Sequence, residues 1–374
     1  MTLWRDVPIG DVLTLQRGFD ITRESQSEGS VPVISSGGVS SYHDTSMADG
    51  PGVVIGRKGT LGKAFYSEGP YWPHDTTLWV RDFKGSEPKF VYYFFKNLDI
   101  SFLDVGSANP TLNRNHVHPI VTRWPDAGSQ RAIAQVLSAL DDKIAVNARV
   151  SKAALDLASL RFDRAREQAL VTVTHYEAVA DVAGGGTPST KVPEYWGGDI
   201  PWVTPTDVTA LAVPYLDRTS RTITQEGFAA CSSAMHPRGS ILMTSRATIG
   251  AFALVSVPVT VNQGFLVVNA KDPKHQWWLF HEMQTRVGDY LAHANGATFL
   301  ELSRGRFKTM DLAVPTDPIV FEQLAAEVEP LHDRARQTSQ ESRMLADLRD
   351  TLLPNLMSGR ISVRQAESVV SEAL

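Results

Sequence analysis

The chain has 374 residues, a formal net charge of −5 and a single cysteine. This length suggests two or three domains, and one cysteine excludes an internal disulfide and any cysteine-rich zinc site. No apolar run approaches the roughly 18 residues of a membrane span, and no basic, hydrophobic leader opens the sequence. We therefore expect a cytoplasmic protein without membrane contact, whose acidic charge disfavours indiscriminate coating of nucleic acid.

A segment from Gln130 to Ala169 contains neither proline nor glycine. Small and apolar residues recur along it at steps of three, four and seven, which indicates an α-helix with a coiled-coil seam. A second segment, from Pro318 to near Pro354, has a similar periodicity. Because polar residues such as Asn147 weaken the seams, we expect the two helices to pair with each other in an antiparallel arrangement. The seam residues are Ile133, Leu137, Leu140, Ile144, Ser151 and Ala154, and then Val328, Leu331, Ala335, Thr338, Ser342, Leu345 and Leu352.

The sequence also repeats itself once. Three segments recur in the same order, and in the first of them Lys58 falls on Arg246, 188 positions later. The aligned segments begin at Gly52 and Ser240, at His74 and Asn262, and at Gly106 and Gly296. We interpret the chain as one unit of roughly 190 residues that is present twice.

Each unit holds short strands of alternating residues, broken by Gly, Pro, Asn and Asp, and one amphipathic helix, near 88–98 and 273–292. This pattern predicts the α+β class: two mixed α/β domains separated by two long antiparallel coiled-coil helices, in a pseudo-twofold internal repeat. The expected boundaries are a first domain at 1–125, a central spacer helix at 126–172, a second domain at 173–316, and a C-terminal spacer helix and tail at 317–374.

The order, spacing and duplication of these parts resemble the specificity subunit of type I restriction-modification systems, over almost the whole chain. The stretches that carry the resemblance are Trp4 to Val12, the Gly184 to Ser189 turn, Arg57 to Gly62, Gln130 to Ala134 with Leu140 to Ile144, and Leu348 to Pro354 with Met357 to Gly359. The resemblance implies that the two mixed domains are target recognition domains, which together read a bipartite, asymmetric DNA target.

The resemblance also implies the partners. Besides double-stranded DNA, these are two modification (methyltransferase) subunits and two ATP-dependent restriction subunits. No cofactor is expected in this chain, because S-adenosylmethionine and ATP would be carried by the partner subunits. The exposed edges of the long helices are the expected docking surface for the methyltransferase.

Two matched segments are candidates for DNA contact, because each places a cation and a hydroxyl directly after an apolar strand. A loop at the end of a strand can approach a phosphate closely and donate hydrogen bonds to it. The alternative is an ordinary turn with a solvated cation. The candidates in and beside these segments are Arg57, Lys58, Thr60 and Lys63, and Ser245, Arg246 and Thr248.

Arg114 and Arg304 also recur at matched positions, each two residues after a leucine. An arginine there can bind phosphate or read guanine through its O6 and N7 atoms, or it can be tied to a carboxylate within the domain. Small polar loops near Ser36 and Thr206 suit groove contacts, although each can equally be a plain surface loop.

No signature of an enzyme is present. His74 and Asp75 could suggest acid-base catalysis, but the matched Asn262 and Gln263 cannot transfer protons at neutral pH. No phosphate-binding loop, amino-methyltransferase tetrapeptide or metal-ligand spacing is found. The sequence therefore predicts a non-catalytic DNA-recognition subunit. The alternatives are a protein-binding adaptor scaffold that does not contact DNA and a stand-alone nuclease or methyltransferase.

Overall fold

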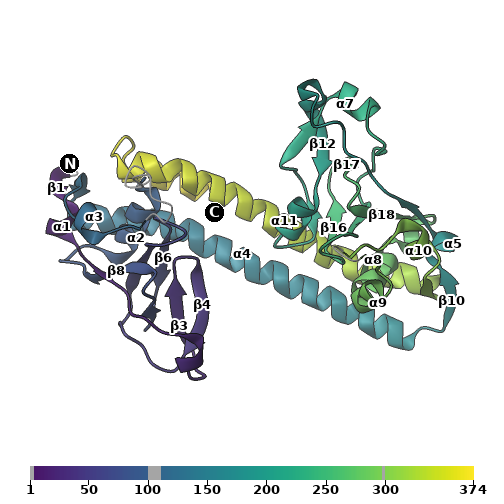
Figure 1. The fold of residues 1–374 in the computed structure, drawn as a ribbon, viewed down its shortest axis with the longest axis horizontal. Coiled ribbons are helices and arrows are strands. Elements are labelled where there is room, and N and C mark those ends of the chain that lie inside the picture. The colour runs from purple at the N-terminus through teal and green to yellow at the C-terminus, as the bar shows by residue number, and fades with distance from the viewer. Residues whose placement is uncertain (1–3, 100–110, 297–299) are drawn as a thin grey trace. The chain divides into compact units, whose positions relative to one another are not determined.

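The computed structural model describes residues 4–99, 111–296 and 300–374 (Figure 1). The chain divides into two compact units, the first made of Met1–Val146 with Ser342–Leu374 and the second of Asn147–Glu341. Each unit contains one mixed α/β domain and a part of each long helix, so the predicted fold class is confirmed. Within the described residues, no helix is both long enough and apolar enough to cross a membrane.

The first unit is built on a four-stranded antiparallel sheet in the order β2–β8–β5–β6. Its core lies between this sheet, helix α2 and the long helices, where Phe90 and Phe94 pack edge-on against Trp124. The strands are β2 Thr14–Arg17, β8 Thr77–Asp82, β5 Gly52–Gly56 and β6 Ala64–Ser67; a second sheet has β4 Gly38–His43, β3 Val31–Ser35 and β7 Trp72–Pro73; β1 Trp4–Pro8 pairs with β9 Val121–Pro125; the helices are α1 Ile9–Val12, η1 Arg23–Ser25, α2 Pro88–Asn97 and α3 Arg114–Val117.

The second unit repeats this plan with a five-stranded sheet in the order β11–β18–β15–β16–β13. Here β18 and β15 hold the places that β8 and β5 hold in the first unit. The strands of this sheet are β11 Ala180–Ala183, β18 Phe265–Ala270, β15 Ile241–Thr244, β16 Phe252–Val255 and β13 Tyr215–Leu216. A three-stranded sheet has β14 Arg221–Ile223, β12 Trp196–Val203 and β17 Thr260–Val261, and β10 Val171–His175 pairs with β19 Asp311–Pro315. The helices are α5 Tyr176–Val179, η3 Pro193–Tyr195, α6 Pro205–Thr209, α7 Gln225–Ala229, η4 Pro273–His275, α8 Gln276–Thr285, α9 Val287–Ala292 and α10 Arg304–Lys308.

The backbone confirms the internal repeat, because the matched loops make the same hydrogen bonds. The Gly59 and Gly62 positions have φ of 74° and 72°, and the matched Ala247 and Gly250 have φ of 59° and 89°. The corresponding bonds are Arg57 N–H to Thr76 O (2.9 Å) and Ser245 N–H to Gly264 O (2.8 Å), Leu112 N–H to Arg57 O and Leu302 N–H to Ser245 O (both 2.9 Å), and Gly62 N–H to Gly56 O (2.9 Å) and Gly250 N–H to Thr244 O (3.0 Å).

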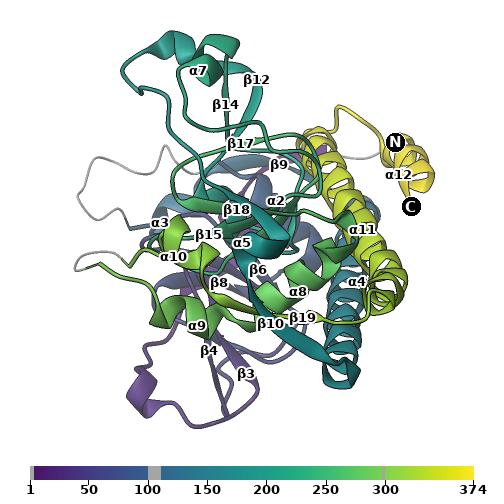
Figure 2. The ribbon, with the colours of Figure 1, turned by 90° about the vertical axis from the view of Figure 1, so that its right-hand side faces the viewer.

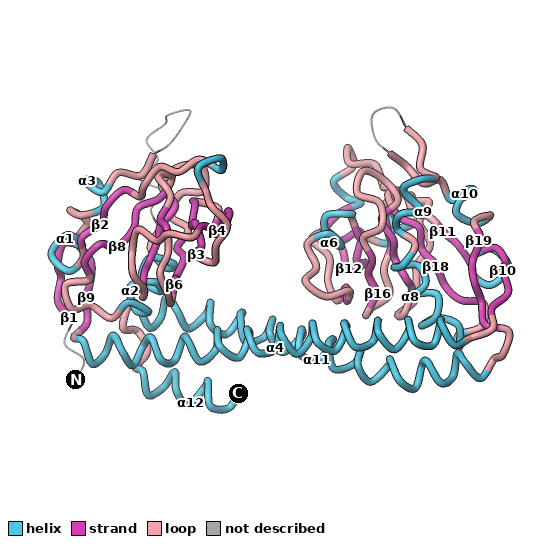
Figure 3. The backbone as a smooth tube through the Cα atoms, turned by 90° about the horizontal axis from the view of Figure 1, so that it is seen from below, coloured by secondary structure: helices cyan, strands magenta, loops and turns pink. Residues whose placement is uncertain are grey.

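The long helices α4 Ala127–Gln168 and α11 Ile319–Met357 pair within each unit (Figure 3). In the first unit Leu140 and Leu345 share one core. In the second, Ser151 Oγ and Thr338 Oγ1 lie 2.6 Å apart, while Asn147 Nδ2 donates to Glu341 Oε2 at 2.9 Å. Later residues of one helix meet earlier residues of the other, so the predicted antiparallel pairing is confirmed.

Helix α11 differs from expectation in where it ends and in passing through an internal proline. Helix α11 continues through Pro354 to Met357, because Leu353, Leu356 and Met357 are buried in the core of the first unit and hold its last turn. It also runs through Pro330, where packing of the helix outweighs the backbone hydrogen bond that a proline removes.

The prediction of a single helix at 273–292 is wrong. The chain forms η4, α8 and α9 instead, with a break at Arg286. The Arg286 side chain donates to Asp289 and to the Asp311 carbonyl, and this turn buries Tyr290, whose hydroxyl lies 2.6 Å from that of Tyr176. The buried contact of Tyr290 with Tyr176 therefore outweighs the helix propensity of the segment.

The helix α12 Val363–Ala373 completes the first unit (Figure 2). Its Ala366 and Val370 enter the core of that unit, and Gly359 in the preceding turn lies against Trp4. Sequence reasoning assigned this segment to the tail without a helix, although its Ser362 to Gln365 capping box was visible in the sequence.

Candidate nucleic-acid interface

The loop after β5 in the first unit is held from both sides by backbone hydrogen bonds. Arg57 is half-buried there, and its Nη1 atom lies 3.4 Å from the Asp75 carbonyl oxygen. Lys58 and Thr60 are exposed, as is Lys63, whose ammonium lies 5.4 Å from the Phe65 ring centre. Left-handed glycines on either side of Thr60 keep the loop tight, so the cations stand on a fixed backbone.

An open groove of about 750 Å³ lies beside this loop and contains three arginines. Arg17 comes from the end of β2, Arg57 from the end of β5, and Arg114 from the first residue of α3. The Asn113 side chain caps α3 by accepting from the Asn115 N–H at 3.0 Å, which fixes where Arg114 leaves the backbone. The fold thus brings together Arg57 and Arg114, which are far apart in the sequence, and adds Arg17.

Asp75 balances part of this positive charge. Its Oδ2 accepts from Arg17 Nη2 at 2.7 Å, and the Arg17 side chain is 55% exposed while that of Asp75 is 16% exposed. Burial favours a higher pKa for Asp75, but the Arg17 hydrogen bond and the charges of His74, Arg17 and Lys58 outweigh it, so the pKa stays below its usual value. Burial, and then repulsion by Arg17, lowers the pKa of Arg57.

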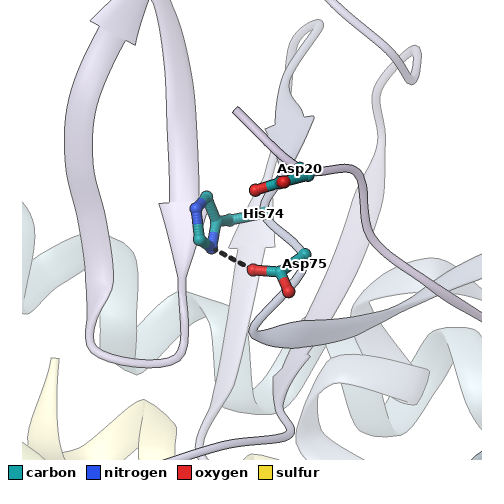
Figure 4. Close-up of side chains that lie close together, drawn as sticks. All are labelled: Asp20, His74 and Asp75. Atoms are coloured by element: carbon teal, nitrogen blue, oxygen red, sulfur yellow. Dashed lines mark ion pairs between the residues drawn. The ribbon is translucent and has the colours of Figure 1, made fainter. Parts of the chain in front are cut away.

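Asp20, His74 and Asp75 form a small polar cluster next to the groove (Figure 4). His74 Nδ1 lies 3.1 Å from Asp75 Oδ1, and the donor atoms of all three residues lie within 4.8 Å of one another. In the described ranges this is the one group of three such side chains with the spacing of a metal site. A metal ion would have to compete with Arg17, which already supplies a positive charge to Asp75.

The matched loop of the second unit differs in its side chains. Ser245 is 3% exposed, so its hydroxyl is not presented at the surface as expected from the sequence. Arg246 is exposed, but its Nη2 pairs with Glu301 Oε1 at 2.8 Å, while Thr248 is exposed at the loop tip. Ala247 adopts the left-handed conformation of the matched Gly59 despite its side chain, which costs on the order of 1 kcal/mol.

The remaining candidates lie close to these loops. Arg304 is exposed at the first residue of α10, which Ser303 caps. Ser36 is half-buried, and its N–H donates to Thr76 Oγ1 at 3.3 Å, so it borders the Arg57 loop. Thr206 is exposed in α6. Residues 106–110 and 297–299 of the matched segments lie outside the described residues.

Sequence reasoning matched Asn262 and Gln263 to His74 and Asp75, as a polar base-reading or structural site, but missed Arg17 and the contact of Thr187 with Gln263. Thr187 Oγ1 donates to Gln263 Oε1 at 2.6 Å, and Asn262 Oδ1 accepts from the Gly264 N–H at 2.8 Å. The match was hidden because the distance between matched residues changes along the chain. Residues 18–20 match 185–187, which lie 167 positions later, whereas Lys58 and Arg246 lie 188 positions apart. Only the backbone bonds reveal this match.

Two copies of one mixed α/β domain, each attached to paired long helices, define a scaffold of duplicated domains. The chain belongs to the family described as type I restriction modification DNA specificity domain, which matches residues 1–155 and 172–325.

Curated relatives have names that agree with this family. The MjaIX specificity subunit of Methanocaldococcus jannaschii is 41% identical over 140 residues, which are 37% of this chain and 32% of that protein. The EcoR124I/EcoR124II specificity subunit of Escherichia coli is 25% identical over 243 residues, 61% of this chain and 59% of that protein. The matches thus span about a third to three fifths of these relatives.

The fold also has a solved counterpart. The crystal structure of the type I restriction-modification S subunit from M. genitalium superposes with a TM-score of 0.65 at 13% identity. The superposition covers 95% of this chain and 96% of that one. Similarity at this level of identity establishes the fold.

Proposed function

We propose that this chain is the sequence-specific DNA-recognition subunit of a type I restriction-modification complex and reads one half of a bipartite, asymmetric target with each domain. The recognition domains are 1–125 and 173–316, and the spacers are 126–172 and 317–374. The observation that carries the proposal is the matched loop after β5 and β15. Its backbone is the same in both units, even where Ala247 must be strained to keep it, while the surrounding side chains differ.

A shared backbone with divergent side chains suits two readers of different sequences. The phosphate groups of any duplex are equivalent, so the same loop can serve both half-sites. Base edges differ, so the side chains around the loop must differ as well. Because the whole chain carries a charge of −5, attraction to DNA has to come from local groups such as the three arginines of the groove.

The chain is non-catalytic by itself and acts in the cytoplasm, with chemistry supplied by its partners. Two methyltransferase subunits would carry S-adenosylmethionine, and two restriction subunits would use ATP. The docking surfaces we propose for the methyltransferase are exposed apolar side chains of the long helices, Val146 and Met344 in the first unit and Leu157 and Leu160 in the second. Exposed apolar side chains of this kind suit contact with another protein.

The same apolar side chains would also suit an adaptor that binds proteins and never contacts DNA. A salt titration separates the two functions. The full chain is combined with its methyltransferase partner, and its affinity for duplex DNA is measured between 50 and 200 mM salt.

If Arg57, Lys58, Arg114, Arg246 and Arg304 each neutralise one phosphate, the slope of log K against log salt is about −4 to −5. An adaptor would show no DNA affinity at any salt concentration. Methylation by the purified chain without a partner would instead identify a stand-alone methyltransferase.

A further inference from the structure

We propose that the base-reading side chains lie where β2 ends and β8 begins in the first unit, and at the matched place between β11 and β18 in the second: Arg17, held by Asp75, reads a guanine, and Gln263, held by Thr187, reads an adenine. This inference rests on the proposed function and adds which residues read which bases.

The two places are equivalent in the fold. Strand β2 pairs antiparallel with β8, and β11 pairs antiparallel with β18. The Phe19 N–H donates to the Pro73 carbonyl at 2.8 Å, and the matched Gly186 N–H donates to the Val261 carbonyl at 3.0 Å. These bonds show that Asp20 is equivalent to Thr187, and Asp75 to Gln263, in the repeated domain. The two clusters therefore occupy one site of the repeated domain, next to the loop proposed to hold phosphate.

The chemistry of the first cluster fits guanine. Arg17 lines the groove together with Arg57 and Arg114, and slightly more than half of its side chain is exposed. Its bond to Asp75 uses one of the five guanidinium N–H groups, so a pair of parallel donors remains for a ligand. Guanine presents two acceptors, O6 and N7, at the spacing of this fork. Asp75 restrains the guanidinium, so less freedom is lost on binding.

The chemistry of the second cluster fits adenine. Gln263 is exposed and carries no charge, and Thr187 anchors its carbonyl oxygen at 2.6 Å. An anchored amide keeps its NH₂ group free and its oxygen can accept a second hydrogen bond. Adenine presents an N7 acceptor next to an N6 donor, which an amide matches with both of its atoms. A guanine at the same place would set its O6 acceptor against the amide oxygen.

The alternative is that Arg17 and Asp75 only stabilise the fold. The second unit argues against it, because it keeps the same backbone bonds with Gly184 and Gln263 at the matched positions and no ion pair between them. The charges are therefore not needed to form this part of the domain. An ion pair with one partner this exposed also contributes little to stability.

The test is a selection of duplexes from a randomised library by the full chain bound to its methyltransferase partner. The variants are Arg17→Gln, Arg17→Lys and Gln263→Ala, and Arg81→Gln is the matched control because Arg81 is an exposed arginine outside the groove. Thermal unfolding and assembly with the partner are measured for each variant, so that a folding defect is recognised.

Arg17→Gln should reduce discrimination at one guanine of one half-site by about 5- to 150-fold and leave the other half-site unchanged. Arg17→Lys should lose the same preference but keep the salt dependence, since a lysine retains the charge without the fork. Gln263→Ala should relax one adenine in the opposite half-site. Arg81→Gln should change neither.

The inference is overturned if the well-folded Arg17 variants keep every base preference, or if they change a position that does not prefer guanine. In those cases the proposed function still stands, because the wild-type complex would continue to select a target. Failure of the wild-type complex to select any sequence would instead overturn the proposed function itself.

Discussion

The two units use one backbone for two different surfaces. Around the loop after β5, the first unit gathers Arg17, Arg57 and Asp75 into a charged groove. At the matched place the second unit has a buried serine, a neutral threonine and glutamine pair, and an arginine bound to Glu301. The difference teaches that the hydrogen-bond frame of the domain tolerates changes in several of the polar side chains around it, while the matched Lys58 and Arg246 keep a cation in the loop.

The largest effect is expected from replacing the mixed domain of one unit, which tests whether the two units act independently. Exchanging residues 1–125 for the corresponding domain of another specificity subunit should replace one half-site completely and leave the other intact, because each frame holds its own polar cluster. The target is measured by sequencing DNA methylated by the complex. A change in both half-sites would show that the two units do not read independently.

The two units should also differ in how much stability they lose in acid. In the second unit His281 Nε2 lies 3.0 Å from His332 Nε2, and burial lowers the pKa from 6.5 to about 4 for His281 and about 3 for His332, with the charge on His281 contributing to the latter. Each histidine binds a proton more readily when unfolded, so stability falls as pH falls from about 6.5 toward 4, by up to about 1.4 kcal/mol per pH unit for each.

Hydrogen exchange resolved by peptide measures this effect in each unit separately. The first unit, where His118 Nε2 accepts from the Leu15 N–H at 3.0 Å, should lose less stability than the second. The double variant His281→Asn, His332→Asn should flatten the pH dependence of the second unit. Equal acid sensitivity of both units in the wild type would contradict this account.

The loop cations should differ in their contribution to DNA affinity. Lys58→Ala should weaken binding to all sequences and lower the salt slope by about one unit, since one phosphate contact is lost. Arg246→Ala should have a smaller effect because Glu301 already competes for this arginine. Glu301→Gln should therefore raise affinity for all sequences. Unchanged slopes for both cation variants would mean that these cations are only solvated.

The smallest effect concerns loop strain. Ala247→Gly should stabilise the second unit by up to about 1 kcal/mol, since glycine adopts the left-handed conformation of Ala247 without a clash. The reverse change, Gly59→Ala, should destabilise the first unit by a similar amount. Chemical denaturation followed by hydrogen exchange measures both. Destabilisation by Ala247→Gly would mean that the alanine side chain makes a compensating contact.

Much of the fold followed from the sequence, because the internal repeat and the helix periodicity can be recognised from the order of the residues alone. The helix break at Arg286 did not follow, since it depends on the buried pairing of Tyr176 with Tyr290. The candidate site was predicted in part: Arg57 and Arg114 do share a groove. Arg17 was missed because a strand pairing brings it next to Asp75, 58 residues further on.

The central claim is that the chain directs a partner to a bipartite DNA target, and methylation mapping tests it most directly. DNA from cells that carry the chain with its methyltransferase partner is sequenced for modified bases. The account predicts one asymmetric motif of two short, different half-sites separated by a fixed gap. A single contiguous motif, or methylation without sequence preference, would contradict it.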